Sequence, residues 1–267
     1  MLAAARHSEI IARVRDHGVV RITDLSRMLG VSDMTVRRDI DTLSEAGLVQ
    51  KVHGGAKVPG SLRTDEPGFE KKSMREETEK SAIAREALSF ITPGSAIGLS
   101  AGTTTWTLAK SLRAIDGLTI VTNSIQIAEV FYRATNRKDG NRSSVILTGG
   151  ERTPSDALVG PIAISALSQL HLDVLFLGVH GVEASAGFTT PNLLEAETNR
   201  AFAATARTVV VLADHTKWGT VGMSTIARLS DVDALVTDDA MPPDARETLR
   251  GLIREVRFAP TATVSAQ

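Results

Sequence analysis

Apolar residues are spaced in two different ways along the chain. Between residues 22 and 46 they recur three and four positions apart, so that Val36, Ile40 and Leu43 share one face of a helix. Beyond Glu79, short and nearly continuous apolar runs alternate with segments of helical spacing. The pattern predicts a small helical domain followed by a larger α/β domain.

The apolar runs beyond Glu79 have the length of strands and the composition of strands that are covered on both faces, as in a parallel sheet. They lie at residues 96–99, 118–122, 144–148, 173–178, 208–213, 234–237 and 255–258. Helical segments separate them at residues 105–113, 124–134, 161–170, 194–206 and 244–254. This alternation predicts an open α/β domain with a mostly parallel sheet.

The first domain has the pattern of a winged helix-turn-helix. Thr23 is expected to cap a first helix, whose inward side chains would be Leu25, Met28 and Leu29. Gly30 is expected to end this helix in a left-handed conformation, which glycine adopts cheaply. Ser32 is expected to cap a second helix that runs to about Ala46, and residues 48–56 are expected to form the hairpin of the wing.

The second helix would pack on one side and present its other side to the major groove of DNA. The residues expected to contact DNA lie at the start of this helix, on its outer side and on the wing: Ser32, Met34, Thr35, Arg37, Arg38, Lys51 and His53. Further phosphate contacts are expected from a preceding helix, through Arg6, Arg13 and Arg15. The alternative is a helical subdomain with a solvated charged face, but the ordered pattern with a wing behind it favours binding to double-stranded DNA.

Net charge adds little to this interpretation. The chain of 267 residues has a formal net charge of −1, and residues 1–60 carry nine Lys and Arg against seven Asp and Glu. An excess of two positive charges predicts weak binding of DNA by one domain, so that tight binding would need several copies.

Composition excludes several kinds of site. Cysteine is absent, which excludes disulfides, thiolate metal ligands and cysteine nucleophiles. The six histidines form no ligand-like cluster, so no metal and no cofactor is expected. The N-terminus has no apolar signal segment and no apolar run is long enough to span a membrane, so we expect a cytoplasmic protein without a membrane partner.

Prolines, glycines and mixed charges follow the wing, and the apolar periodicity is lost there. The sequence therefore predicts a DNA-binding domain at residues 1–57 and a linker at 58–78 that is partly helical toward its end. An effector-sensing domain is predicted at 79–258, and a tail at 259–267.

Glycines and polar residues follow five of the predicted strands, and ligands bind beyond the carboxyl ends of strands in open α/β sheets. Gly102-Thr103-Thr104-Thr105 leads directly into a helix, where free N–H groups and hydroxyls favour a phosphate. The alternative is a glycine turn with a threonine cap. The remaining candidates for effector contact could also be caps, turns or structural side chains: Ser100, Asn123, Ser124, Gly149, Gly150, His180, Glu195 and Lys217.

These motifs resemble the DeoR family of bacterial transcriptional regulators over nearly the whole chain. In the first domain the resemblance is carried by residues 29–32 (Leu-Gly-Val-Ser), 35–39 (Thr-Val-Arg-Arg-Asp), Leu43, 47–48 and 53–56 (His-Gly-Gly-Ala). In the second it is carried by residues 102–105, 121–124 (Val-Thr-Asn-Ser), 149–150, 187–191 (Gly-Phe-Thr-Thr-Pro), 195–197 (Glu-Ala-Glu) and 213–219 (Ala-Asp-His-Thr-Lys-Trp-Gly).

The resemblance implies an α/β effector domain with an open, ribose-5-phosphate-isomerase-like sheet, similar also to glucosamine-6-phosphate deaminase, behind an N-terminal winged helix-turn-helix. It implies a repressor of a carbohydrate catabolic operon that a phosphorylated sugar or related intermediate releases from DNA. It also implies a homodimer or homotetramer. Residues 102–105 and Lys217 would hold the phosphate, while Asn123, His180 and Glu195 would address the rest of the ligand.

Two adjacent residues depart from the family pattern. Ser100-Ala101 stand where the family often has Asp-Ser, and a serine is shorter than an aspartate and uncharged. The sugar hydroxyls would lose an acceptor there, so the effector is expected to differ from that of better-known members.

Two other functions compete with this one. An isomerase or deaminase of the aldose-ketose type would need a general base over the sugar carbon, and the absence of an acid at position 100 and the attached DNA-binding domain argue against it. A DNA-binding scaffold with a degenerate pocket would bind no phosphorylated sugar at all.

Overall fold

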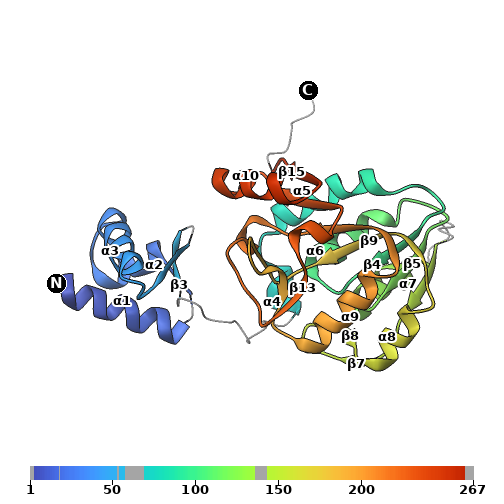
Figure 1. Cartoon of the computed structure of the whole chain (residues 1–267), viewed down its shortest axis with the longest axis horizontal. Helices are drawn as coiled ribbons and strands as arrows, with labels where there is room; N and C mark the ends of the chain where they lie inside the picture. The colour runs from blue at the N-terminus through green and yellow to red at the C-terminus, as the bar shows by residue number, and fades with distance from the viewer. Residues whose placement is uncertain (1–2, 18, 53, 58–68, 136–142, 262–267) are drawn as a thin grey trace. The chain divides into compact units, whose positions relative to one another are not determined.

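The computed structural model describes residues 3–17, 19–52, 54–57, 69–135 and 143–261. Its contacts divide the chain into two units, Met1–Leu62 and Arg63–Gln267 (Figure 1). The stretch 58–78, predicted as a linker, includes the short helix α4 (Phe69–Ser73) and the first residues of α5 (Glu77–Ala87). Both helices belong to the second unit.

The first unit combines three helices with a three-stranded antiparallel sheet of order β1-β3-β2. Its elements are α1 (Ala3–His17), β1 (Val19–Arg21), α2 (Ile22–Leu29), α3 (Asp33–Glu45), β2 (Gln50–Val52) and β3 (Gly55–Lys57). The sequence pattern did not predict β1, whose three residues pair with β3. Gly55 permits this pairing, because a Cβ atom there would lie 2.0 Å from the carbonyl oxygen of Val20.

The predicted turn and second cap of the helix-turn-helix are confirmed, and two details of its first helix are wrong. Gly30 is left-handed with φ 66°, and the hydroxyl of Ser32 accepts a hydrogen bond from the N–H of Thr35. However, α2 begins at Ile22, before Thr23, without a side-chain cap. Met28 is 38% exposed rather than inward, whereas Ile22 and Leu25 are buried and Leu29 packs against the same core.

The second unit is built on a seven-stranded parallel sheet of order β15-β14-β12-β9-β4-β5-β6. All seven predicted runs are strands of this sheet, with ends shifted by up to two residues: β4 (Ala96–Leu99), β5 (Thr119–Thr122), β6 (Ser144–Leu147), β9 (Leu172–Gly178), β12 (Ala206–Leu212), β14 (Ala234–Asp238) and β15 (Glu255–Ala259). The expectation that strands are covered on both faces fails for β6. It forms the edge of the sheet, and Ile146 and Leu147 are 41% and 37% exposed.

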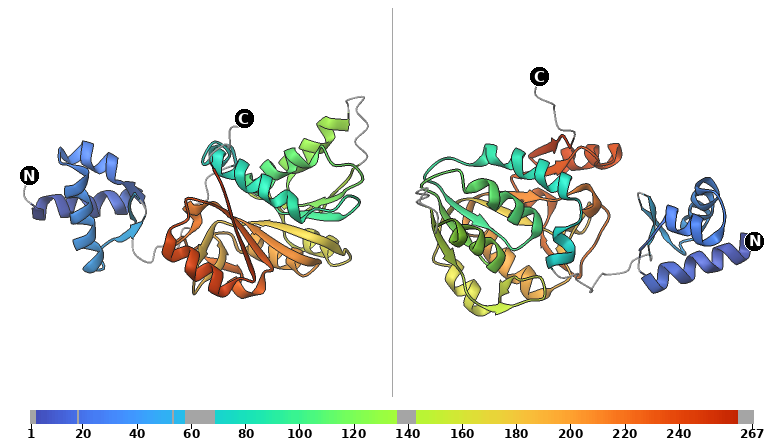
Figure 2. Two further views of the ribbon diagram at one scale, coloured as in Figure 1. Left: turned by 90° about the horizontal axis from the view of Figure 1, so that it is seen from above. Right: turned by 180° about the vertical axis from the view of Figure 1, so that it is seen from behind.

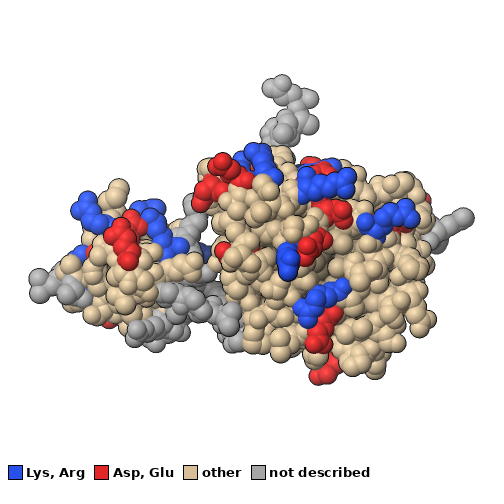
Figure 3. Space-filling view, in the orientation of Figure 1, with Lys and Arg blue, Asp and Glu red and all other residues tan. Residues whose placement is uncertain are grey.

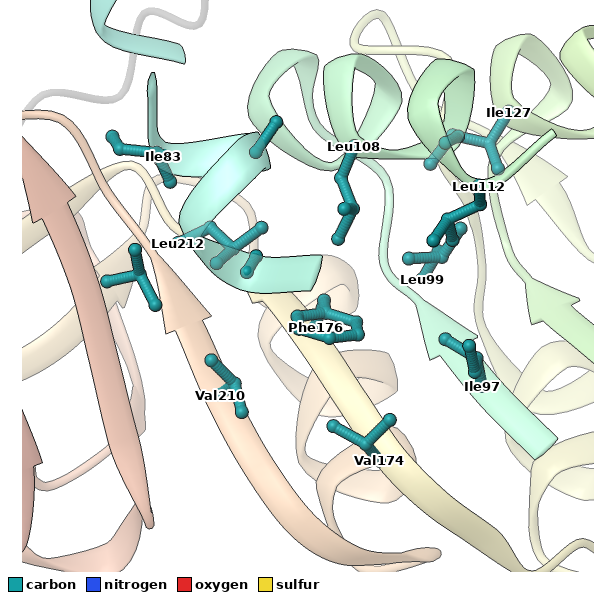
Figure 4. Packing of buried hydrophobic residues seen from close by; sticks show 14 of the residues in the cluster. Ile83, Ile97, Leu99, Leu108, Leu112, Ile127, Val174, Phe176, Val210 and Leu212 are labelled. Atoms are coloured by element: carbon teal, nitrogen blue, oxygen red, sulfur yellow. The ribbon is translucent and has the colours of Figure 1, made fainter. Parts of the chain in front are cut away.

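Helices cover both faces of this sheet (Figure 2). Helices α5, α6 (Thr103–Leu112) and α7 (Ile125–Thr135) pack on one face, and α8 (Pro161–Leu167), α9 (Leu193–Ala203) and α10 (Pro243–Leu252) on the other. On the first face, Leu108 and Leu112 of α6 point toward Leu99 and Phe176 of the sheet (Figure 4). Burial of such side chains contributes about 1.5–3 kcal/mol each, so α6 is held firmly over β4 and β9.

In the described part of the second unit, five short strands lie outside the main sheet and were not predicted. The strands β7 (Glu151–Arg152) and β8 (Leu158–Val159) form a pair, and β10 (Gly181–Glu183), β11 (Gly187–Thr190) and β13 (Ser224–Ala227) form a three-stranded sheet. Each has two to four residues, too few to show a periodicity. Among the described helices, none is long and apolar enough to cross a membrane.

The order of the strands marks where a ligand is expected. From β4 the chain proceeds through β5 and β6 toward one edge of the sheet, whereas β9, β12, β14 and β15 follow toward the other. The direction therefore reverses between β4 and β9, and ligands of open α/β sheets bind beyond the carboxyl ends of the strands at such a point.

Candidate DNA-binding and effector sites

Helix α3 has one buried side and one exposed side, as predicted. Val36, Ile40 and Leu43 are at most 3% exposed, whereas Met34 is 70% exposed. The guanidinium groups of Arg37 and Arg38 are also exposed and form no ion pair within the part of the chain that the structure describes. The exposed side of α3 therefore carries two cations that no acid neutralises by direct contact.

The start of α3 is fixed by its own side chains. The hydroxyls of Ser32 and Thr35 are 2.9 Å apart, and the Ser32 hydroxyl also caps the helix. Both side chains thus serve the helix start, and Thr35 is half-buried.

A buried carboxylate fastens α3 to α1. Asp39 accepts hydrogen bonds from Arg6 Nε at 2.7 Å and Arg6 Nη2 at 3.0 Å, and His7 Nε2 lies 3.0 Å from its second oxygen. The guanidinium of Arg6 holds the pKa of Asp39 below its usual value. The guanidinium of Arg6 thus fastens α1 to α3, and a contact of Arg6 with a DNA phosphate stays a prediction.

The wing carries less free charge than expected. Lys51 forms an ion pair with Asp41 of α3 at 2.5 Å, and His53 lies outside the described part. The side chain of Arg15, on α1, also lies outside the described part. Basic and acidic side chains are interspersed over the face shown in Figure 3. No extended basic surface is visible on that face.

The loop after β4 is joined to β9 at the point where the strand order reverses. The hydroxyl of the fully buried Ser100 accepts a hydrogen bond from the N–H of Gly178 at 2.9 Å. A Cβ atom on Gly102 would lie 3.1 Å from the Thr105 hydroxyl and 3.7 Å from the Cα of Gly178. The loop is therefore close to the end of β9, with little room for a side chain at Gly102.

The three threonines that open α6 have different roles. The Thr105 hydroxyl donates to the carbonyl oxygens of Ser100 and Gly102, at 2.8 and 2.9 Å. The hydroxyls of Thr103 and Thr104 make no hydrogen bond to any described residue. Gly102 provides no side-chain cap, so the N–H groups of the first helical turn also lack the usual acceptor. This helix start thus offers several donors to an anion.

Asn123 and Ser124 are buried and bind main chain. The amide of Asn123 accepts from the N–H of Ala101 at 2.8 Å and donates to the carbonyl of Leu158 at 3.0 Å. The Ser124 hydroxyl accepts from the N–H of Ile127 at the start of α7. These contacts tie the loop after β4 to β5 and β8.

The glycines after β6 differ in their surroundings. Both have positive φ, 73° at Gly149 and 120° at Gly150. A Cβ atom on Gly150 would lie 2.5 Å from the carbonyl oxygen of Val159, so a glycine is required there for packing against β8.

His180 lies directly after β9. Its backbone N–H donates a hydrogen bond to the carbonyl oxygen of Thr189 at 3.0 Å.

Glu195 lies in the first turn of α9 and is 8% exposed. Its carboxylate accepts hydrogen bonds from the hydroxyls of Thr153 at 2.9 Å, Thr190 at 3.2 Å and Ser155. Asn192 caps the same helix turn. Glu195 is therefore surrounded by three hydroxyls, two from the turn between β7 and β8 and one from the end of β11.

Lys217 and His215 each lie beside a buried acid beyond the ends of β12 and β14. Lys217 Nζ lies 3.8 Å from Asp214 Oδ2, and His215 Nδ1 lies 2.8 Å from Asp238 Oδ1. The hydrogen bond with Asp238 raises the pKa of His215. Burial opposes ionisation of Asp238, but its hydrogen bonds with His215 lower its pKa. Lys217 is half-buried here, beside a fully buried carboxylate.

Residues 6–61 match the model of the DeoR-like helix-turn-helix domain, and residues 75–239 match that of the DeoR C terminal sensor domain. The protein belongs to the DeoR family. Named relatives in this family are transcriptional regulators, and the protein is likewise a transcriptional regulator.

Three DeoR-family relatives cover nearly the whole chain. The HTH-type transcriptional regulator GolR of Listeria innocua is 34% identical over 90% of this chain and 92% of its own. A putative aga operon transcriptional repressor of Escherichia coli O157:H7 is 32% identical, over 92% and 90%. The glycerol-3-phosphate regulon repressor of Escherichia coli K12 is 32% identical, over 93% and 96%.

Among solved structures, a D-ribose-5-phosphate isomerase in complex with phospho-erythronic acid is 22% identical, covering 54% of each chain with a TM-score of 0.39. Ribose 5 phosphate isomerase A from Neisseria gonorrhoeae is 16% identical, covering 56% of each chain with a TM-score of 0.40.

Sequence reasoning missed several residues of this DeoR-family sensor domain. Asp214 lies inside a motif that was identified, and Asp238 directly follows an apolar run, so a search for polar residues at strand ends would have found both. The buried Lys80 of α5 gave no such signal, because a single lysine in a helix is usually solvated. Among the described residues, no group of three His, Cys, Asp or Glu could hold a metal ion.

Proposed function

We propose that the sensor domain binds a phosphorylated sugar or a related intermediate, with its phosphate at the first turn of α6 and at Lys217. The observation that carries this proposal is the division of roles among the threonines. Thr105 fixes the loop, whereas the hydroxyls of Thr103 and Thr104 and the N–H groups beside them have no acceptor among the described residues. Such a helix start favours an anion.

The remaining predicted effector residues fall into two groups. Ser100, Asn123, Ser124 and Gly150 would position the loops, because their polar atoms or backbone are engaged within the fold. Gly149, His180 and Glu195 would face the sugar end of the ligand. One relative is named for a glycerol-3-phosphate regulon, which supports a small phosphorylated carbon compound as the ligand class.

For the DNA-binding domain, we propose that Met34, Arg37 and Arg38 contact the major groove, with Lys51 and His53 approaching the backbone from the wing. Ser32 and Thr35 would act at the N-terminus of α3, where a phosphate can also be received. The protein would be a cytoplasmic repressor of a carbohydrate catabolic operon, released from its operator by the ligand.

We also propose that the repressor acts as a homodimer or homotetramer, and that residues 58–78 join a DNA-binding domain at 1–57 to a sensor domain at 79–258. The weak positive charge of residues 1–60 supports several DNA-binding domains per operator.

The ligand proposal is tested by thermal unfolding of the full chain. Glycerol 3-phosphate, fructose 1-phosphate and a wider panel of phosphorylated sugars, polyols and sugar acids are each compared with the unphosphorylated compound. A true ligand at a hundredfold excess over its Kd stabilises by about 2.7 kcal/mol. We expect the phosphorylated ligand to raise the Tm and the unphosphorylated compound to leave it unchanged.

Two variants make this test specific. Lys217→Met should abolish the rise in Tm, whereas Lys110→Met should retain it, because Lys110 is an exposed lysine stacked on Trp106. A panel without any stabilising phosphorylated compound would contradict the proposal and favour a sensor domain that only assembles copies.

A further inference from the structure

A buried carboxylate beside Lys217 is only half satisfied. Asp214 is fully buried, and its Oδ1 accepts hydrogen bonds from the N–H and the hydroxyl of Thr216. Its Oδ2 makes no hydrogen bond to any residue that the structure describes, and Lys217 Nζ lies 3.8 Å away. Burial of a charge is costly unless a partner compensates it, so Asp214 depends on nearby cations.

A second cation near this carboxylate comes from a different element. Lys80 of α5 is 4% exposed, and its ammonium donates a hydrogen bond to the carbonyl oxygen of Arg75. The pKa of Lys80 is lowered, chiefly by burial. The negative charge of Asp214 opposes this shift, and the positive charge of Lys217 adds to it. The ammonium of Lys80 is therefore attracted by Asp214 while it holds the main chain just before α5.

The main chain that Lys80 holds is a strained turn between α4 and α5. Glu76 is left-handed with φ 48° and ψ 45°, a conformation that is unfavourable for a residue with a side chain. A turn in this conformation persists only where surrounding contacts maintain it. The hydrogen bond from Lys80 to Arg75 is one such contact.

This turn stands between the candidate phosphate site and the chain that leads to the DNA-binding domain. Helix α4 is the first element described after residue 57. The ring of its Phe69 packs edge-on against the ring of Trp106, with 5.5 Å between the ring centroids. Trp106 belongs to the first turns of α6, which begins at the candidate phosphate site. Both ends of the α4–α5 turn are therefore in contact with elements that carry ligand-binding residues.

We propose that Lys80 is a positioning residue that transmits occupancy of the phosphate site to the α4–α5 turn. The proposal rests on the function proposed above. A phosphate that engages Lys217 draws this cation away from Asp214. Asp214 then attracts Lys80 more strongly, the hydrogen bond to Arg75 weakens, and the turn and α4 change their conformational population.

The proposal is tested by hydrogen–deuterium exchange of the full chain with and without saturating inorganic phosphate as the probe. Phosphate should slow exchange at residues 103–108. It should also change exchange at residues 74–80 by about fivefold or more, the lower end of typical coupling between sites. In Lys80→Met the first effect should remain and the second should disappear, a split that loss of stability alone would not produce.

A matched control and a second variant complete the experiment. Arg85→Met removes an exposed cation from the same helix and should behave as the unmodified chain. Asp214→Asn retains the shape of the side chain, and it should also abolish the change at 74–80. It replaces Lys80→Met if that variant does not fold.

The outcomes separate the two proposals. If residues 74–80 still respond to phosphate in both Lys80→Met and Asp214→Asn, the role of Lys80 is overturned while the phosphate site stands. If phosphate leaves residues 103–108 unchanged in the unmodified chain, the phosphate site fails and the role of Lys80 fails with it.

Discussion

At the scale of the residue, the polar side chains beyond the strand ends either build the loops or remain available to a ligand. Asn123 and Ser124 belong to the first kind, since main-chain groups engage them. Thr103 and Thr104 belong to the second, since no described group accepts from their hydroxyls. The type of residue alone does not separate these roles, because a threonine that fixes a loop and one that meets a phosphate look alike in a sequence.

The pair of His215 and Asp238 makes the stability of the sensor domain depend on pH. The pKa of His215 is raised in the folded state, so its stabilising contribution is complete below its usual pKa of about 6.5. That contribution is lost as the pH rises through the raised value, while Asp238, whose pKa is lowered, stays ionised. We expect the Tm of the sensor domain to fall as the pH rises above neutrality.

His215→Gln should flatten this dependence, and His171→Gln at an exposed position should leave it in place. Melting curves of the three proteins from about pH 6 to pH 9 provide the measurement. An unchanged slope in His215→Gln would show that other groups control the stability.

Arg38 is the residue whose loss should most weaken DNA binding, if it reads a base. Arg38→Ala is then expected to cost about 1–3 kcal/mol of operator affinity, because an exposed arginine on α3 can form two hydrogen bonds to a guanine. Fluorescence anisotropy with operator DNA measures the change. Arg254→Ala, an exposed position of the sensor domain, is the control, and equal affinities for the two variants would remove Arg38 from the interface.

At the scale of the element, the position of the recognition helix α3 depends on one buried carboxylate. Asp39 receives Arg6 and His7 from α1, so the helix proposed to contact DNA is fixed to the first helix of the chain. The sequence motif therefore contains a structural acid directly after two exposed arginines.

Asp39→Asn should lower the Tm of the DNA-binding domain by several degrees and weaken operator binding, because an amide cannot replace a carboxylate that accepts from a guanidinium. Asp41→Asn, on the same helix, is the matched control, since its ion pair with Lys51 is about half exposed and such pairs contribute little. Circular dichroism and anisotropy measure the two effects. Comparable losses in both variants would contradict a special role for Asp39.

Elements with strong periodicity could be predicted from the sequence, and short or contact-dependent ones could not. The seven strands of the main sheet were found because buried parallel strands read as apolar runs. The strand β1 was missed because three residues show no period, and β1 is formed by its pairing with β3. The site residues at strand ends were found by their position, whereas Lys80 was missed because its burial depends on the tertiary packing of α5.

At the scale of the whole molecule, the chain joins a weakly charged DNA-binding domain to a sensor domain with a helix start that we propose binds an anion. Regulation requires that the ligand bind one arrangement of the repressor more tightly than another, and linkage makes the effect reciprocal. A ligand that weakens operator binding must itself be bound less tightly when the operator is present.

The most direct test of this account measures operator affinity of the full chain by anisotropy, with and without the phosphorylated compound that stabilises it. We expect the compound to weaken operator binding by about 5–150-fold, and Lys217→Met to keep its operator affinity but lose this response. An operator affinity that the bound compound leaves unchanged would contradict the account.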